Sequence, residues 1–144
     1  MSSISAAMTR DHRACDEQFA QAEGAAAEGD WAAARRAVDA FRAATERHFR
    51  LEEEALFPAF EHHTGMTQGP TEVMRTEHAE MRELLDRLAA AAAAADADDF
   101  LGLGETLNLL VQQHNMKEEQ VLYALLDQAL GAEGERLLGR LAHG

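Results

Sequence analysis

The chain has 144 residues, and its 26 acidic and 13 basic side chains give a formal net charge of −13. This length suits a single domain, 1–144, and the one cysteine excludes a disulfide framework and agrees with a reducing compartment. The acidic balance argues against nucleic-acid and anionic-membrane partners, and no apolar run is long enough to span a bilayer. We therefore expect a cytoplasmic protein, whose protein partner, if any, is unknown.

Helical periodicity covers most of the chain, which is rich in alanine and contains two prolines. The first helix is predicted near 3–27, the second near 31–61, the third near 70–95 and the fourth near 99–130. A short fifth helix is predicted near 133–142. Four long helices with short connections predict an all-α fold, an antiparallel up-down-up-down four-helix bundle with a short C-terminal fifth helix.

A few residues set the predicted helix ends. Asp30 and Asp99 each precede an aromatic residue and are predicted N-caps, while Pro70 suits the first position of the third helix. Pro58 lies inside the second helical pattern and should kink or end that helix. Because the second helix would overshoot the start of the third, either it stops near Pro58 or the loop in the 60s doubles back along the bundle.

One face of each long helix follows the three-and-four spacing of buried positions. The predicted inward stripes are Ile4, Met8, His12, Cys15 and Phe19; Phe41, Thr45, His48, Glu52 and Ala55; Met74, His78, Met81 and Leu85; and Leu103, Leu107, Val111, His114, Glu118, Val121 and Leu125. Every stripe contains a histidine. The second and fourth stripes also carry a glutamate four residues after it, on the same side of the helix.

The histidines are regularly spaced along the chain. His12 and His48 are 36 residues apart, and so are His78 and His114. The midpoint of each pair is an aspartate in a predicted turn. In an antiparallel hairpin, residues equidistant from the turn lie at the same height, so each pair should face across its hairpin.

The two hairpins also resemble each other in sequence. Residues 48–57 and 114–123 share a histidine, two adjacent glutamates and a leucine followed by an aromatic residue. Two copies related by an approximate two-fold axis would bring four histidines and two carboxylates to the bundle axis. Two carboxylates buried without an inward Arg or Lys need protons or metal ions to balance their charge. The predicted metal ligands are His12, His48, Glu52, His78, His114 and Glu118.

This ligand set suits a pair of octahedral ions with positions left for a bridge and a small ligand; iron or manganese fits, and zinc is the main competitor. The neighbouring charges Glu53, Glu54, Glu119 and Asp16 are expected to be solvated, with Glu53 or Glu119 as an alternative candidate for orienting a ligand histidine. Cys15 is interpreted as a small core residue. The apolar wall of the site is expected from Phe49, Met74, Met81, Leu107 and Val111.

With these residues in place, the chain resembles the hemerythrin-like, or HHE cation-binding, domain family over nearly its whole length. The family pattern is a histidine on the first helix, His-x-x-x-Glu on the second, a histidine on the third, and His-x-x-x-Glu or a similar pair on the fourth. The matching residues are His12, His48 and Glu52, His78, and His114 and Glu118. The resemblance implies a non-haem centre of two iron ions (Fe2+/Fe3+) with an oxo or hydroxo bridge.

Two positions depart from the oxygen-carrying hemerythrins. Arg82 stands where they have a second histidine on the third helix, and their last carboxylate is an aspartate five residues after the histidine, whereas here it is Glu118, four after. The ligand set is similar instead to the di-iron domain of bacterial iron–sulfur cluster repair proteins.

The resemblance therefore implies a di-iron protein that binds, senses or reacts with dioxygen, nitric oxide or peroxide. The alternatives are iron storage or donation, iron-level sensing, and iron–sulfur cluster repair. Whether the protein is an enzyme is left open.

Overall fold

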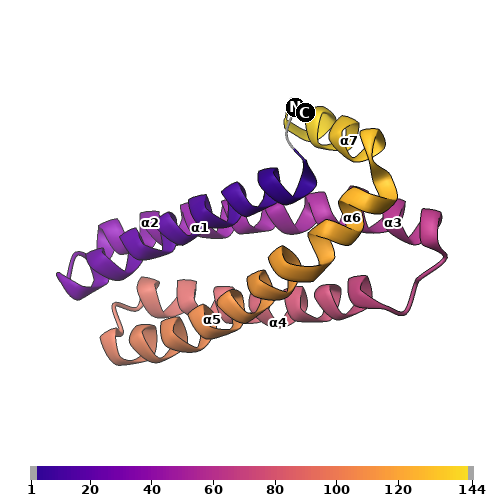
Figure 1. Cartoon of the computed structure of the whole chain (residues 1–144). Helices are drawn as coiled ribbons and strands as arrows, with labels where there is room; N and C mark the ends of the chain where they lie inside the picture. Colours follow the sequence, from indigo (N-terminus) through magenta and orange to yellow (C-terminus); the bar gives the residue numbers. More distant parts are fainter. Residues whose placement is uncertain (1–2, 143–144) are drawn as a thin grey trace.

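The structure is a computed structural model that describes residues 3–142 (Figure 1). Its helices are α1 (Ile4–Ala27), α2 (Trp31–Leu51), α3 (Phe57–Thr64), α4 (Pro70–Ala93), α5 (Ala97–Lys117), α6 (Tyr123–Leu130) and α7 (Ala132–Ala142). Two π-helical segments join helices end to end: η1 (Glu52–Leu56) lies between α2 and α3, and η2 (Glu118–Leu122) lies between α5 and α6. The result is four long rods, α1, α2–η1–α3, α4 and α5–η2–α6, followed by α7.

The rods form the predicted all-α antiparallel bundle with a short fifth helix. α1 packs on α2 and α4 packs on α5, so the bundle consists of two helical hairpins. Figure 1 shows both hairpin turns at one end of the bundle and α7 at the other end. No helix within residues 3–142 has the length and the apolar character that crossing a membrane requires.

The N-caps of the second and fourth rods are equivalent. The Asp30 carboxylate accepts the N–H of Ala33 at 3.0 Å, as predicted. The prediction for Asp99 was wrong: the N-cap is Asp96, whose carboxylate accepts the N–H of Asp99 at 3.1 Å. The residues between them are competent helix formers, so the earlier aspartate caps the free amides and the later one falls within the first turn.

The second rod does not end at Pro58. Pro58 lies in the first turn of α3, directly after the π-helical segment, and the rod continues to Thr64. The carbonyl of Glu53, five residues earlier, accepts a hydrogen bond from the Arg75 guanidinium at 3.3 Å. Gly65 then adopts φ +74°, a left-handed conformation that ends the helix. Figure 1 shows α3 reaching past the start of α4, with the loop of residues 65–69 running back, which is the second of the two predicted possibilities.

The π-helical segments shift the inward face of each rod by one residue. In η2, the extra residue turns Val121 out to solvent, 57% exposed, and buries Leu122 instead. The predicted stripe of the fourth rod was therefore wrong beyond Glu118, because Leu125 is also displaced from the core. The same shift in η1 leaves Ala55 half-buried and turns Leu56 inward.

The apolar core falls into two clusters, one on each side of the level of the four histidines. The cluster toward the hairpin turns includes Cys15, Phe19, Val38, Phe41, Phe49, Met81, Leu85, Leu88, Phe100, Leu103 and Leu107. The cluster toward α7 consists of Ile4, Met8, Leu56, Phe57, Phe60, Met74, Leu122, Tyr123, Leu126 and Leu130. A polar layer between two apolar clusters is shielded from water along the bundle axis.

The start of α1 is held by the last rod and by α7. The Asp127 carboxylate accepts the N–H of Ile4 at 2.8 Å and that of Ser5 at 3.2 Å, so an α6 side chain caps α1. A Cβ atom at Gly134 would come within 2.6 Å of the Ile4 Cδ1 atom, so a larger residue there would require the Ile4 side chain to shift.

Candidate metal centre

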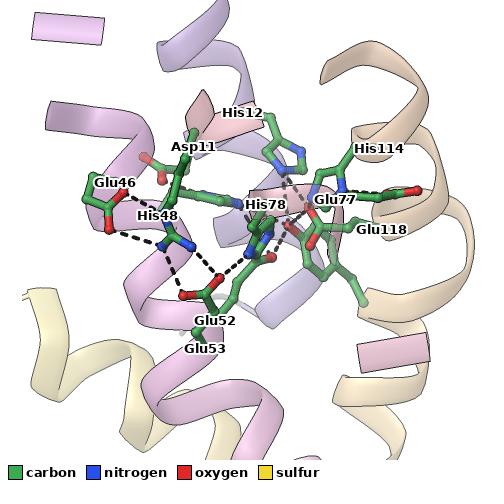
Figure 2. Close-up of polar contacts among 12 residues, drawn as sticks. Asp11, His12, Glu46, His48, Glu52, Glu53, Glu77, His78, His114 and Glu118 are labelled. Atoms are coloured by element: carbon green, nitrogen blue, oxygen red, sulfur yellow. Dashed lines mark hydrogen bonds and ion pairs between the residues drawn. The ribbon is translucent and has the colours of Figure 1, made fainter. Parts of the chain in front are cut away.

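The structure brings the six predicted ligands together in the polar layer (Figure 2). Each of the four rods contributes at least one of them. All six are buried, namely His12, His48, Glu52, His78, His114 and Glu118. Buried polar side chains from four separate rods meet at one level of the bundle, as the matched sequence spacing predicts.

The histidines pair within each hairpin. The ring centroids of His12 and His48 are 4.6 Å apart, and those of His78 and His114 are 4.9 Å apart. The Phe49 ring stacks on His78, with centroids 3.9 Å apart and an angle of 14° between the planes. The pairs therefore face each other across the hairpins, and an aromatic ring fixes the plane of one of them.

Each buried glutamate lies between histidines of the two hairpins. Glu52 approaches the Nε2 atom of His78 at 3.1 Å and that of His48 at 3.5 Å. By the same pattern, Glu118 approaches Nε2 of His12 at 3.1 Å and Nε2 of His114 at 3.2 Å. The carboxylates thus link the hairpins, and both begin a π-helical segment.

These donors form two groups that could each hold a metal ion. One group contains Glu52, His78, His114 and Glu118, and the other contains His12, His48 and Glu118. The donor atoms within a group lie within 4.8 Å of one another. Because Glu118 belongs to both groups, its carboxylate can bridge two ions.

Each of the four buried histidines has a carboxylate at its Nδ1 atom, the ring nitrogen that faces away from the centre. The Nδ1 atoms of His12 and His78 lie 2.7 Å from Glu119 and Glu53, respectively. The Nδ1 atoms of His48 and His114 lie 2.7 Å from Asp11 and 2.8 Å from Glu77, respectively (Figure 2). An ionised carboxylate only accepts, so Nδ1–H donates and the Nε2 atom of the neutral ring is left to face the centre, the tautomer that binds metals.

The sequence analysis assigned only some of these carboxylates to the histidines. Glu53 and Glu119 were expected to be solvated, but both are partly buried and bind a histidine, which is the alternative described above. Asp11 and Glu77 received no role, because each lies one position off the inward stripe. One sequence pattern could have indicated them: in both hairpins an acidic residue directly precedes the first histidine.

Arg82 holds one of these carboxylates, Glu53, in place. Its guanidinium donates to both oxygens of Glu53 at 2.9 Å and to Glu46 at 2.9 and 3.0 Å. These hydrogen bonds, to Glu46 and then to Glu53, raise the pKa of the Arg82 guanidinium. Arg82 is therefore a fixed cation that positions Glu53 and, through it, His78.

Protons compete with cations at this centre. Burial would lower the pKa of His48, yet the charge of Glu52 and the hydrogen bond with Asp11 raise it well above its usual value. Burial would likewise raise the pKa of Glu118, but its contacts with Glu52 and His114 hold it well below its usual value. The raised pKa of His48 favours its protonated form, so a cation that binds to this ring has to displace a proton.

Four buried polar atoms at the centre make no hydrogen bond of acceptable geometry with another described residue, although Oε1 of Glu52 lies 3.1 Å from Nε2 of His78. They are Oε1 of Glu52, Nε2 of His78, Nε2 of His114 and Oε2 of Glu118. All four belong to the same four-residue group that could hold an ion. An unpartnered buried polar atom costs about 1–3 kcal/mol, so a cation that these nitrogen and oxygen donors coordinate would remove the penalty. The residues present fit a metal ion.

The surroundings of the site are apolar. Phe49, Met74, Met81 and Leu107 are buried as expected for its wall, and Val111 is half-buried. Cys15 is also a buried core residue, as interpreted from the sequence. Burial, followed by the charge of Asp11, raises the pKa of its thiol, which keeps the sulfur protonated and makes it a poor metal ligand.

The sequence did not indicate Tyr123, which lies at the centre. Its hydroxyl is 2.8 Å from Oε2 of Glu52, 2.8 Å from Oε1 of Glu118 and 3.1 Å from Nε2 of His12. Burial, together with the charges of Glu52 and Glu118, raises the pKa of Tyr123 well above its usual value. The repeat aligns Tyr123 with Phe57, and this difference in aromatic type was the available indication.

The fold and the site define a helical bundle with a buried histidine–carboxylate centre. The sequence profile of the hemerythrin HHE cation-binding domain matches residues 3–126. The chain therefore belongs to the hemerythrin HHE cation-binding domain family. Comparisons with curated proteins and with solved structures give no significant match.

Proposed function

We propose that the protein holds two iron ions and that this centre binds, senses or reacts with a small oxidant: dioxygen, nitric oxide or peroxide. His12, His48, His78 and His114 would be terminal ligands, and Glu52 and Glu118 would bridge. The observation that carries the proposal is the pair of donor groups that share Glu118, one of which contains four unpartnered buried atoms.

The donor set favours iron over a closed structural ion. Six protein side chains cannot saturate two six-coordinate ions, so positions remain for a bridging oxygen and a small exogenous ligand. Zinc is satisfied with four ligands and has no redox chemistry. A bound iron pair supplies electron transfer to or from such a ligand.

The protein itself orients the imidazole rings and excludes water from the centre. The carboxylates of Asp11, Glu53, Glu77 and Glu119 fix the ring planes and keep each Nε2 atom directed at the centre. The two apolar clusters exclude water on both sides of the polar layer. A small neutral oxidant enters such a site more readily than a charged or bulky molecule.

Metal analysis and optical spectroscopy test the proposal. Protein from iron-fed cells should contain about two irons per chain and, when oxidised, an oxo-to-iron charge-transfer band. The reduced protein should change its spectrum on exposure to dioxygen, nitric oxide or peroxide. Less than one metal per chain, or no spectral response to any of the three, contradicts the proposal.

A second candidate is an iron store, donor or iron-level sensor, and the unpartnered buried atoms favour it because they make the fold depend on the cation. A cation at 100 times its Kd adds about 2.7 kcal/mol to the free energy of unfolding. For a chain of this size, that raises Tm by about 5–10 °C. Equal melting temperatures with and without a chelator would remove this candidate.

A further inference from the structure

Tyr123 breaks the two-fold symmetry of the site. Its side chain is fully buried, and its hydroxyl lies among the predicted ligands rather than beside them. Phe57, the residue at the equivalent position of the other hairpin, is also fully buried and lies near His78, with ring centroids 6.0 Å apart. At this position the two halves of the centre therefore differ by one oxygen atom.

That oxygen contacts every member of one donor group. The Tyr123 hydroxyl is 3.1 Å from Nε2 of His12 and 3.3 Å from Nε2 of His48. It is also 2.8 Å from Oε1 of Glu118, the third member of the group. A single atom at hydrogen-bonding distance from three potential ligands of the same ion lies where it can be a ligand itself.

The hydroxyl has too few protons for these contacts. It lies 2.8 Å from a carboxylate oxygen of Glu52 and 2.8 Å from one of Glu118, both acceptors when ionised. One phenolic proton serves only one such contact fully. A multivalent cation in place of that proton satisfies the phenolate and both carboxylates at once.

The number of donors in each group points the same way. The group of Glu52, His78, His114 and Glu118 has four side chains, whereas the group of His12, His48 and Glu118 has three. The phenol is on the side of the smaller group. With Tyr123 included, both groups offer four protein donors.

We infer that Tyr123 is a ligand, as phenolate, of the ion held by His12, His48 and Glu118. The inference rests on the proposed iron centre and extends it. When the ion binds, the phenolic O–H bond breaks, an oxygen–metal bond forms, the proton leaves to solvent, and no electron is transferred. The two ions then have equal numbers of protein donors but differ in donor type, because only one of them is bound by a phenolate.

The chain is well suited to a spectroscopic test because Tyr123 is its one tyrosine. The ferric full-length protein should show a broad visible phenolate-to-iron band, and resonance Raman excitation in that band should enhance phenolate ring modes. Tyr123→Phe should retain two irons per chain and lose both signals completely. Phe57→Leu, an apolar change at the equivalent position, should retain both signals.

The outcomes separate this inference from the proposed function. A wild-type protein with two irons and no phenolate modes overturns the ligand assignment and leaves the iron centre intact. A visible band that survives in Tyr123→Phe arises from another ligand and also overturns it. Wild-type protein that binds no iron overturns both proposals. The wild-type Raman spectrum decides the matter even if Tyr123→Phe fails to fold.

Discussion

The two hairpins share a scaffold but differ in chemistry. Both place a capping aspartate at the turn, histidines on facing helices, and a glutamate at the start of a π-helical segment. They differ at the aromatic residue after that segment, Phe57 in one and Tyr123 in the other. The comparison shows that a repeated framework can place two groups of donors at the same level of the bundle while single residues make the groups chemically different.

The outer layer shows the same contrast. Glu53 is held by Arg82, which is 31% exposed and fixed by a second carboxylate. Its counterpart Glu119 is held by Arg13, which is 58% exposed and lies 3.7 Å from a second carboxylate, that of Asp16. The first hydrogen-bonded network is therefore more rigid than the second, although both carboxylates bind a histidine at 2.7 Å.

The largest expected effect comes from removing the carboxylate common to both groups. Glu118→Ala should weaken binding of the full metal complement more than 100-fold, because it takes a donor from each ion. Glu52→Ala should weaken metal binding less, because the donor group of His12, His48 and Glu118 does not include Glu52. Metal content after gel filtration and chelator competition measure the difference, with the exposed Glu54→Ala as control. Equal losses in Glu118→Ala and Glu52→Ala would contradict the prediction that Glu118 contributes more to the centre than Glu52 does.

Substitutions around the π-helical segments test the shifted register. Leu122→Ala should lower the free energy of unfolding by about 2–5 kcal/mol, because the side chain is buried. Leu56→Ala should have a similar effect at the equivalent site. Val121→Ala, at an exposed position, should change it by less than about 0.5 kcal/mol. Urea unfolding of the metal-free protein measures all three, and a larger effect at Val121 than at Leu122 would restore the uninterrupted α-helical register.

The outer carboxylates should have a smaller effect on metal affinity. Glu53→Gln and Glu119→Gln should each weaken it about 10–100-fold, because a neutral amide oxygen is a weaker orienting acceptor for the histidine than a carboxylate. Arg82→Gln should also weaken binding, and more than Arg13→Gln does, since Arg13 is the more exposed of the two. Competition with a chromophoric chelator gives the four affinities. Identical effects of the two arginine substitutions would show that the two networks are equally rigid.

The smallest expected effects are at the helix caps. Asp30→Ala and Asp96→Ala should each lower the free energy of unfolding by about 1 kcal/mol, because each removes the acceptor for a free amide. Asp99→Ala, within the first turn of α5, should lower the free energy of unfolding by less. Thermal unfolding of the metal-free protein measures these effects. A larger loss of stability in Asp99→Ala than in Asp96→Ala would indicate that Asp99 is the N-cap, as predicted from the sequence.

Much of the fold could be predicted from the sequence because the helical pattern is long and seldom interrupted. The stripes of α1 and α4 are buried as predicted, from Ile4 to Phe19 and from Met74 to Leu85. The meeting of the six side chains followed from their spacing, since equal distances from two turns give equal heights. Their binding of metal remains a prediction.

The π-helical segments could not be predicted, because their hydrogen bonds depend on contacts between rods. Pro58 offered a local reason for a break in the second rod, but η2 has the same form without a proline. Periodic counting across η2 therefore selected Val121 instead of Leu122, and it passed over Tyr123. Asp11 and Glu77 were missed for a related reason: they reach a histidine on a neighbouring helix from beside the inward face.

The hold of Asp127 on the first turn of α1 has a consequence for biosynthesis. It joins residues 123 positions apart, and the hydrogen-bond partners of the His12 ring, Glu118, Glu119 and Tyr123, also lie in the fourth rod. The first hairpin is therefore synthesised before either of these carboxylates or the phenol. The full set of candidate donors exists only after the fourth rod has been translated, so any cation that uses all of them binds after that point.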